Sequence, residues 1–514
     1  MLNGNHVGWN LEATYQQLPK AFYSEAKPTA VRQPQLLLIN SRVASRLGLD
    51  PMLIQDQLHA EIFAGNQLPP NSRPIAQAYA GHQFGGFTML GDGRAILLGE
   101  QRTPTGELFD VQLKGPGMTP YSRRGDGRAA LGPMLREYII SHAMDSLGIP
   151  TTLSLAVAST GEPVYRQRNE PGAVLTRIAS SHIRVGTFQY AAARGNVDDL
   201  RSLADYTIAR HYPELSDSTE KYLEFLKAVI QRQAQLIAQW MSVGFIHGVM
   251  NTDNVSIGGE TIDYGPCAFM NSYRQSTVFS SIDDGGRYAY GNQPSICQWN
   301  LARFAETLLP ILHGDYKTAV ELATSAIESF AEYYQAAWLA LMSRKLGLTE
   351  SRANHQQLVD DLLELLERHQ LDFTNALRAL SEVQPISGNV ASTAAASPCN
   401  SIDFSNLYSE LSGSRLTGLN QIEHWLQRWQ SILSSTGVSL GTAQTVIVKT
   451  NPSVIPRNHL VEQAISSVVE EADFQPLQKL LEVLSTPFEL AQSDAHYSRP
   501  PIGGDGDYCT FCGT

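Results

Sequence analysis

The sequence predicts an α+β fold of two lobes, with a mainly β first lobe, a helical second lobe and additional helices toward the C-terminal end. Between residues 76 and 178, short apolar runs alternate with polar residues and stop at glycine or proline, which is typical of strands joined by turns. From Asp217 onward, apolar residues recur at helical spacing over long stretches. The expected regions are an N-terminal extension over 1–75, the β lobe over 76–178, the helical lobe over 179–345 and a helical C-terminal region over 346–514.

Length and composition limit the class of protein. A chain of 514 residues has material for two or three domains. Its net charge of -12 and pI near 5.6 argue against a broad nucleic-acid-binding surface. No apolar run is long enough to span a bilayer, and residues 1–27 show neither a signal-peptide nor a transit-peptide pattern. Five cysteines in this length do not make a disulfide framework, so we expect a cytoplasmic protein without nucleic-acid or membrane partners.

The first residues carry few periodic signals. Up to about Asn71 we expect an irregular leader with one helix near 41–49. A run rich in glycine and aromatic residues follows at 79–87, and an apolar strand is expected over 95–98.

A Gly-Asp-Gly-Arg tetrad occurs twice, at 91–94 and at 125–128. Gly91 and Gly93 would let backbone N–H groups approach phosphate oxygens, because glycine has no Cβ in the way. The second tetrad belongs to a glycine-rich, basic loop over 115–128, whose arginines could bind phosphate bidentately. The two tetrads therefore suggest a polyphosphate held from two sides. The alternatives are a plain turn that begins a strand and a flexible surface loop.

Lys114 lies between the two tetrads. It ends an alternating strand, 108–114, on the polar face of that strand. A helix expected over 133–148 carries Glu137 in its first turns, within reach of Lys114. The two residues predict a structural ion pair with Lys114 as a phosphate-binding residue, and an ordinary surface salt bridge is the alternative.

Residues 154–178 are expected to form a meander with turns at 160–161 and 171–172. Arg177 ends its last strand, and Arg184 follows shortly after it. Two arginines so close together suggest that phosphates bind here.

A long amphipathic helix is expected next. It should begin at a capping pattern formed by Asp217 and Glu220 and end at Gly244. It leads directly into a polar loop, 247–254, which contains Asp253.

Two short β-branched runs, 255–257 and 261–263, follow this loop and are joined by Gly258-Gly259. This pattern predicts a hairpin that returns Asp263 to the side of Asn254. An amide oxygen and a carboxylate are hard ligands that suit Mg²⁺. Turn capping by these two residues is the alternative.

The loop and hairpin together resemble the catalytic and metal loops of protein kinases. His247, Asn254 and Asp263 match the kinase pattern in order. One position departs from it, since Val249 stands where a kinase has its catalytic aspartate, and Asp253 is the only carboxylate of the loop.

The rest of the chain is expected to be mainly helical, apart from a Ser/Ala/Gly-rich insert over 386–401. The last residues include Cys509-Thr-Phe-Cys512, the spacing of a redox dithiol, and no second pair follows to complete a zinc site. Two unpaired cysteines are the alternative. Helices are expected over 299–313, 318–346, 357–380 and 419–434.

Taken together, these motifs resemble the selenoprotein O family of kinase-like proteins. The resemblance covers most of the chain, in order. It rests on the runs Gly81-His-Gln-Phe-Gly, Leu90-Gly-Asp-Gly-Arg, Leu113-Lys-Gly, Thr119-Pro-Tyr-Ser-Arg, Gly125-Asp-Gly-Arg, Arg136-Glu137, His247-Gly-Val-Met-Asn-Thr-Asp-Asn, Asp263-Tyr-Gly-Pro, Gly286-Arg-Tyr and Tyr497-Ser-Arg-Pro-Pro.

The resemblance implies a two-lobed protein-kinase-like fold that binds ATP in reverse and transfers AMP to Ser, Thr or Tyr hydroxyls of other proteins. It implies Asp253 as general base, and Asn254 and Asp263 as ligands of Mg²⁺ or Mn²⁺. The nucleotide-binding residues that it implies are Gly91, Gly93, Arg94, Lys114, Asp126, Gly127, Arg177, Arg184 and Asp263. The sequence leaves open whether ATP or UTP is the donor.

The same resemblance implies a redox role for the tail, because some family members carry selenocysteine at the place of Cys512. A disulfide between Cys509 and Cys512, or one to Cys267, would fit that role. The sequence also leaves two other functions open. They are an ordinary kinase, which Val249 opposes, and a catalytically inactive kinase-like scaffold, which Val249 favours.

Overall fold

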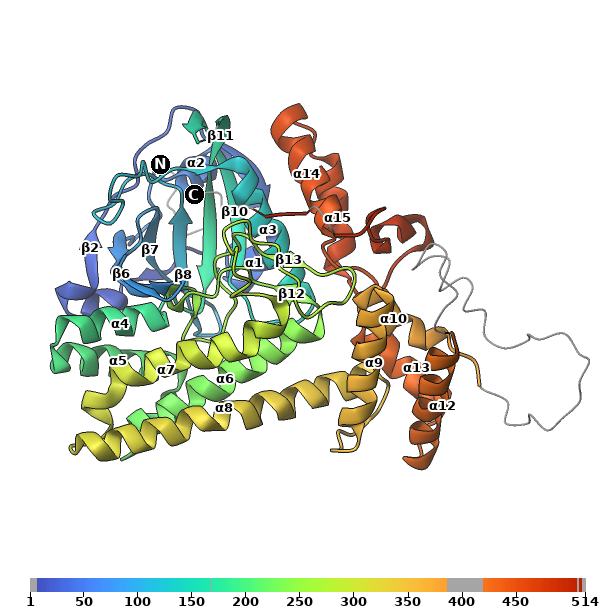
Figure 1. Cartoon of the computed structure of the whole chain (residues 1–514). Coiled ribbons are helices and arrows are strands. Elements are labelled where there is room, and N and C mark those ends of the chain that lie inside the picture. Colours follow the sequence, from blue (N-terminus) through green and yellow to red (C-terminus); the bar gives the residue numbers. More distant parts are fainter. Residues whose placement is uncertain (1–6, 167, 386–418, 506–507, 511–514) are drawn as a thin grey trace, which may run out of the picture.

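The computed structural model describes residues 7–166, 168–385, 419–505 and 508–510. The fold is mixed, with one large antiparallel sheet and many helices, in agreement with the predicted α+β class. Figure 1 shows the sheet at one end of the molecule, with the helices of residues 185–345 beneath it and the later helices extending to the other side. The insert predicted over 386–401 lies outside the described residues.

The large sheet is antiparallel throughout and has nine strands in the described part of the chain. They are β1 (Leu11–Glu12), β2 (Tyr23–Glu25), β3 (Gln35–Ile39), β4 (Ile75–Gln77), β7 (Ala95–Arg102), β8 (Leu108–Lys114), β9 (Ala129–Ala130), β10 (Leu153–Tyr165) and β11 (Asn169–Ala179). Their order is β2-β4-β7-β8-β11-β10-β3, with β1 added to β7 and β9 to β11. The strand predicted at 108–114 is confirmed, and it lies at the centre of the sheet between β7 and β11.

The leader is more regular than predicted. The helix expected near 41–49 is confirmed as α1 (Ser41–Arg46), with the Asn40 side chain accepting a hydrogen bond from the Val43 N–H. The expectation of an otherwise irregular leader is wrong, because β1, β2 and β3 belong to the sheet and α2 (Gln57–Ala64) packs on it. These strands have two to five residues, too few for alternation to show in the sequence.

β10 and β11 form one long hairpin in place of the predicted meander. The turns expected at 160–161 and 171–172 both lie inside the paired strands. The register shifts between Ser159 and Pro163, so a bulge absorbs the residues that suggested the first turn. Pro171 is paired directly with Pro163.

The long helix leading to the polar loop is confirmed, but it begins at Lys221 and Glu220 makes no side-chain cap.

The helix predicted over 357–380 is two helices, because Gln370 between them adopts a left-handed conformation with φ of 54°. The remaining helices are α3 (Leu131–Ser146), α4 (Val185–Arg194), α5 (Val197–His211), α6 (Lys221–Ser242), α7 (Gln293–Leu312), α8 (Tyr316–Lys345), α9 (His355–His369), α10 (Phe373–Ala379), α12 (Leu419–Ser435), α13 (Leu440–Thr450), α14 (Asn458–Glu471) and α15 (Gln475–Ser485).

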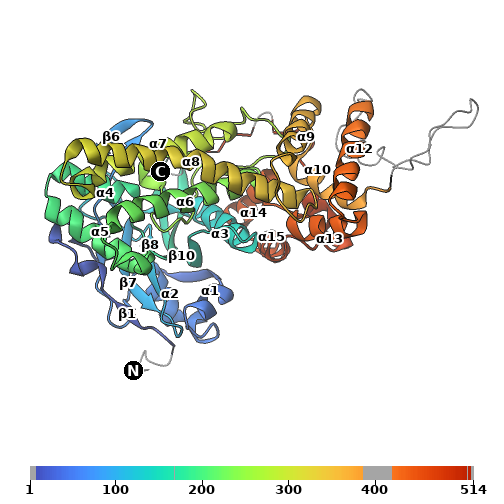
Figure 2. The ribbon, with the colours of Figure 1, turned by 90° about the horizontal axis from the view of Figure 1, so that it is seen from below.

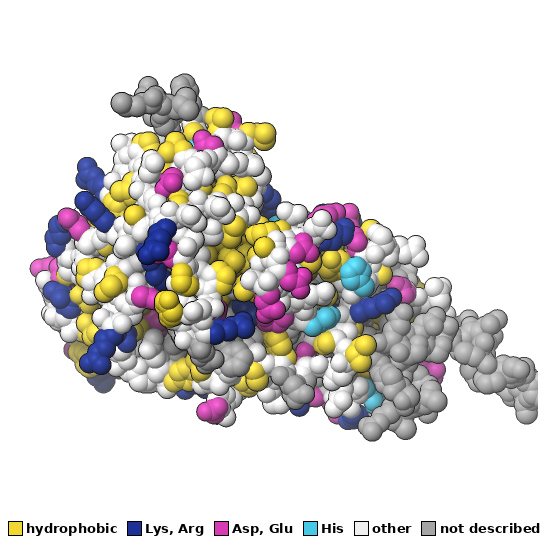
Figure 3. All heavy atoms as spheres, turned by 90° about the horizontal axis from the view of Figure 1, so that it is seen from above, with side chains coloured by type: hydrophobic (Ala, Val, Ile, Leu, Met, Phe, Trp, Pro, Cys, Tyr) yellow, Lys and Arg dark blue, Asp and Glu magenta, His cyan; other side chains and the backbone are white. Residues whose placement is uncertain are grey.

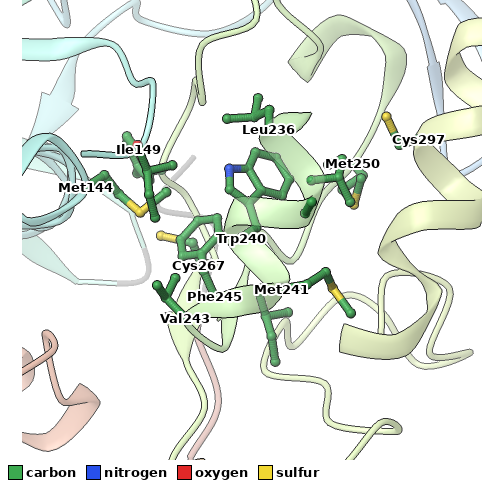
Figure 4. Close-up of a cluster of buried hydrophobic side chains, with 14 of the residues drawn as sticks. Met144, Ile149, Leu236, Trp240, Met241, Val243, Phe245, Met250, Cys267 and Cys297 are labelled. Atoms are coloured by element: carbon green, nitrogen blue, oxygen red, sulfur yellow. The ribbon is translucent and has the colours of Figure 1, made fainter. Parts of the chain in front are cut away.

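A buried cluster below the sheet anchors the end of α6. Figure 4 shows Trp240 within this cluster, together with Phe245, Met250 and Cys267. The Trp240 indole N–H donates to Thr261 Oγ1 at 2.8 Å, which ties α6 to the segment that precedes Asp263. The chain therefore leaves α6 at a fixed position and in a fixed direction.

Two of the C-terminal helices, α14 and α15, pack on α3 from the side away from the sheet, as Figures 1 and 2 both show. Arg136 of α3 pairs with Glu462 of α14, and the Tyr508 hydroxyl donates to Glu462 at 2.7 Å. The fully buried Arg457 donates to Asp372, the residue that caps α10, at 3.1 Å. The bonds to Glu462 fasten the C-terminal region to α3, which carries Glu137, and the Arg457 bond fastens it to α10.

On the face seen in Figure 3, acidic and basic side chains are interspersed. This face therefore offers no broad basic surface of the kind that nucleic acid requires. Within the described part of the chain, no helix is both long and apolar enough to cross a membrane.

Candidate functional site

The polar loop between α6 and Asp253 is held by side chains around it. The chain passes through β12 (Phe245–Ile246), which pairs with β13 (Ala268–Phe269), and then reaches His247. The buried His247 ring donates from Nε2 to the Ile262 carbonyl at 2.8 Å. This bond links the loop to the residue just before Asp263, so the two predicted site segments are fixed relative to each other.

Asp253 is buried beneath a small hairpin formed by β5 (Ala80–Gln83) and β6 (Gly86–Met89). A Cβ at Gly81 would lie 2.3 Å from Asp253 Oδ1, so only glycine fits here. The His82 N–H donates to Thr252 Oγ1 at 2.7 Å and holds the hairpin in place. Among the described residues, Oδ1 of Asp253 has no hydrogen-bond partner. Burial raises the pKa of the Asp253 carboxyl to about 6, although Arg184 opposes that rise.

Asp263 lies in the opposite kind of environment. Its carboxylate accepts hydrogen bonds from Lys114 at 3.0 Å, Arg177 at 2.5 Å and Arg184 at 2.9 Å. Burial favours the neutral acid, but Arg177, Lys114 and Arg184 outweigh it and hold the Asp263 pKa well below its usual range. The backbone of Asp263 has a φ of 62°, an uncommon conformation for a residue other than glycine.

The hairpin predicted to return Asp263 to the loop does not form. Ser256 makes an isolated bridge with Arg184, and Thr261 makes one with Thr151, so the two runs pair with other segments instead of each other. A turn is present one residue earlier than predicted, since the Gly259 N–H donates to the Ser256 carbonyl at 3.1 Å and Ile257 and Gly258 are its central residues. The partners of the two runs were not predicted, because neighbouring β-branched runs look alike whether they pair together or apart.

The predicted ion pair between Lys114 and Glu137 is confirmed at 2.5 Å, and both side chains are buried. Arg177 lies 3.4 Å from the same Glu137 and also donates to Gln112 Oε1 at 2.6 Å. Gln112 stands opposite Arg177 in the pairing of β8 with β11. Sequence reasoning did not assign a role to Gln112, although its place on the polar face of the Lys114 strand was a usable signal.

We refer to Lys114, Arg177, Arg184, Glu137 and Asp263 as the buried ion cluster. Its members carry three positive and two negative charges, so it has a net charge of +1. Three cations that converge on one point can bind an anionic ligand such as a polyphosphate. Tyr79 packs its ring 4.7 Å from the Arg184 guanidinium and fixes it on the remaining side.

The first tetrad is packed differently from the prediction. A Cβ at Gly91 would lie 2.4 Å from the Tyr121 ring, and one at Gly93 would lie 2.9 Å from the Tyr121 carbonyl. The two glycines thus let the loop over 115–128 close onto the first tetrad. The Thr119 hydroxyl donates to the Asp92 carbonyl at 2.6 Å across this contact. Sequence reasoning missed Tyr121, whose role depends on a contact between distant residues.

Two predicted nucleotide residues lie away from the buried ion cluster. Asp126 is exposed and forms an ion pair with Arg166 at 3.0 Å. Gly127 packs against Gly117, and its carbonyl accepts a hydrogen bond from the Gly117 N–H at 3.1 Å. Arg94 is half-buried, and its carbonyl accepts from the Gly115 N–H at 2.8 Å. Within the described residues, neither Asp126 nor Gly127 is hydrogen-bonded to Asp263.

Asn254 and Asp263 carry the two kinds of oxygen predicted to hold a divalent ion, but among the described residues the two side chains share no hydrogen bond. The Asn254 amide N–H group donates to the Val249 carbonyl at 2.9 Å, which leaves its amide oxygen available. One amide oxygen and one carboxylate leave the other positions for water and phosphate, as Mg²⁺ prefers. Within the described residues, no group of three or more His, Cys, Asp or Glu side chains could hold an ion without such partners.

The tail residue Cys509 is an exposed free thiol, whereas Cys512 lies outside the described residues. Cys267 is also a free thiol, but burial raises its pKa to about 12, so its reactive thiolate form is disfavoured. Thr510, which follows Cys509, donates a hydrogen bond from Oγ1 to the carbonyl of Pro266, which precedes Cys267, at 2.7 Å. The tail therefore docks on the segment that follows Asp263.

A buried carboxylate with a raised pKa beside a cationic cluster defines an enzyme site for group transfer from a nucleotide or another polyphosphate. Comparisons with known proteins indicate which chemical group is transferred. The family described as "Protein adenylyltransferase SelO" matches residues 6–485. This chain belongs to that family.

Similar proteins carry the name "Protein nucleotidyltransferase YdiU". The one from Bacillus mycoides (strain KBAB4) is 52% identical over 514 residues, covering 100% of both chains. Those from Bacillus cereus (strain AH187) and Bacillus anthracis are each 51% identical over 514 residues, again covering 100% of both chains. The match is therefore not confined to the site.

Proposed function

We propose that this protein transfers AMP from ATP to Ser, Thr or Tyr hydroxyls of other proteins and releases pyrophosphate. Membership of an adenylyltransferase family supports this activity, and so does the position of the buried Asp253, whose backbone carbonyl accepts a hydrogen bond from Arg184 of the buried ion cluster at 3.0 Å. We further propose that the sheet and the helices beneath it are the two lobes of a kinase-like fold, with ATP between them.

In this proposal the cations of the buried ion cluster bind the triphosphate. Lys114 comes from β8, Arg177 from β11, and Arg184 precedes α4, so three elements converge on one point. The glycine tetrads extend the same site, with Gly91, Gly93, Arg94, Asp126 and Gly127 as further nucleotide-binding residues. Charge neutralisation at fixed positions lowers the barrier, because pyrophosphate leaves with additional negative charge.

Asn254 and Asp263 would hold Mg²⁺ or Mn²⁺. The bound ion would supply further positive charge beside the phosphate oxygens. Asp263 is suited to this role because its lowered pKa keeps it ionised at any working pH. His247 contributes by fixing Ile262, the neighbour of Asp263.

Asp253 would accept the proton of the attacking hydroxyl. Its pKa of about 6 makes it a stronger base than an ordinary aspartate, yet it remains largely ionised at neutral pH. The place of the usual kinase aspartate is taken by the buried Val249, which cannot accept a proton.

The single observation that carries this proposal is Asp253, a buried carboxylate with a raised pKa and an unpartnered oxygen, beside the buried ion cluster. ATP labelled at the α-phosphate or at the γ-phosphate tests it. Incorporation of the α-label into protein is expected. Incorporation of the γ-label would mean an ordinary kinase, and incorporation of neither would mean a scaffold.

We also propose that Cys509 and Cys512 form a redox pair that regulates the enzyme through the docked tail. The exposed thiol of Cys509 and the bond from Thr510 to Pro266 support this role. Oxidation should then change the AMP-transfer rate of the wild-type protein and leave Cys509→Ser unaffected.

A further inference from the structure

The hairpin formed by β5 and β6 makes a two-stranded sheet of its own, separate from the large sheet. β5 covers the catalytic loop, and β6 is the outer strand. Figure 2 shows the β6 hairpin standing out from the ribbon beside α7. The strand is short and reads Gly-Phe-Thr-Met, with Phe87 and Met89 each 48% exposed.

An open edge of this composition is unusual. Edge strands are commonly protected by lysine, proline or a covering segment, since their free N–H and C=O groups can pair with another chain. β6 has neither a charge nor a proline. Such an edge beside a catalytic residue suggests that pairing with another chain is part of the function.

The register of the hairpin shows which groups are free. Phe84 and Gly85 have φ of 48° and 89°, as a two-residue turn of type I′ requires. The Leu90 N–H donates to the Tyr79 carbonyl at 2.9 Å, which places the bonded pairs at every second position along the ladder. The N–H and C=O groups of Phe87 and Met89 therefore point away from β5, and the described residues give them no hydrogen-bond partner.

The register also shows which face of the hairpin lies toward Asp253, the proposed general base. Gly81 lies on the Asp253 side, because a Cβ placed on it would be 2.3 Å from Asp253 Oδ1. Thr88 stands opposite Gly81, so its side chain lies on this face. Phe87 lies on the other face, where its ring meets His82 at 5.2 Å.

We propose that the outer edge of β6 binds the acceptor protein as an added, extended strand. The acceptor residue would stand opposite Thr88, because side chains alternate and Thr88 carries the one side chain of β6 on the Asp253 side, where Gly86 has none. Its two neighbours would pair with the backbone of Phe87 and Met89 and pack on their apolar side chains. The acceptor is thus an extended segment with a hydroxyl residue between apolar neighbours, and this proposal rests on the function proposed above.

A fluorescent peptide with one tyrosine between two valines tests the pairing directly. Methylation of both valine amide nitrogens removes the N–H groups that would bond to β6, and methylation of the tyrosine nitrogen, which points away from β6, is the matched control. Binding in the presence of a non-hydrolysable ATP analogue is measured by fluorescence polarisation. We expect the valine-methylated peptide to bind about tenfold more weakly and the control peptide to bind as the parent does.

Variants of the protein give an independent measurement. Phe87→Ala should raise the KM for the peptide severalfold and leave nucleotide affinity unchanged, and Phe87→Pro should do the same by removing the outward N–H. Met52→Ala, at a methionine that is 80% exposed elsewhere, is the control.

Equal affinity for all the peptides, or an unchanged peptide KM in both Phe87 variants, would overturn the docking proposal. The binding measurement needs no transfer step. A failure of the proposed AMP transfer would instead be seen as missing α-label with peptide binding intact.

Discussion

Asp253 and Asp263 are ten positions apart in the sequence and lie in opposite electrostatic environments. Three cations contact Asp263 and hold its pKa well below the usual range. Asp253 is covered by the β5–β6 hairpin, and burial raises its pKa to about 6. The same residue type is thereby suited to two roles, a permanently charged ligand and a proton acceptor.

The comparison also predicts opposite effects on stability. The lowered pKa of Asp263 means that its charge stabilises the fold above the unfolded pKa of about 4, and this contribution is lost as the pH falls through the folded pKa. The raised pKa of Asp253 has the opposite effect on the pH dependence of stability. Its favourable contribution is complete below pH 4 and is lost as the pH rises toward about 6.

The largest effect is expected for Asp263→Asn. Asparagine tolerates the positive φ, so the change removes the charge and keeps the backbone. We expect AMP transfer to be undetectable, and stability to fall by about 3 kcal/mol because three buried cations lose the carboxylate that they share. Label transfer and urea unfolding measure the two effects. A variant with wild-type turnover would disprove the metal-ligand role.

Asp253→Asn should lower the transfer rate by about 10² to 10⁴, the usual contribution of a general base. In contrast to Asp263→Asn, it should not destabilise the fold at neutral pH, since the ionised Asp253 is itself unfavourable there. Single-turnover kinetics and thermal unfolding provide the test. Equal destabilisation by the two variants would mean that the two environments do not differ.

The pH dependence sharpens the comparison further. Since Asp253 must be ionised to accept a proton, kcat/KM of the wild-type protein should fall about tenfold per pH unit below a pKa of about 6. The residual activity of Asp253→Asn should lack this decrease. If the decrease persists in the variant, another group is responsible, and Asp92, whose buried carboxyl has a pKa raised to about 6, would be tested next.

The smallest effect is expected for Asp126→Asn. This residue is exposed and its ion pair with Arg166 contributes about 0 to 1 kcal/mol, so stability should be nearly unchanged. If Asp126 belongs to the nucleotide site as proposed, the KM for ATP should still rise a few fold. Steady-state kinetics at varied ATP measure this, and an unchanged KM would exclude Asp126 from the nucleotide site.

Much of the site was predictable because its motifs are local. Lys114 ends an alternating strand, Glu137 lies one turn into a helix, and both follow from patterns within a few residues. The packing of Gly91 under Tyr121, and the pairing of Arg184 with Ser256, could not be predicted. Each depends on contacts between residues far apart in the sequence, which leave no periodic signal.

The sequence by itself determined the mixed α and β class, the family and the residue types of the site, because composition, periodicity and motif spacing are properties of the chain alone. Only the tertiary structure decided that Lys114, Arg177 and Arg184 meet on one carboxylate while Asp253 is covered by Gly81. The physical reason is that a pKa depends on distance and burial. Both are fixed only when separate elements pack together.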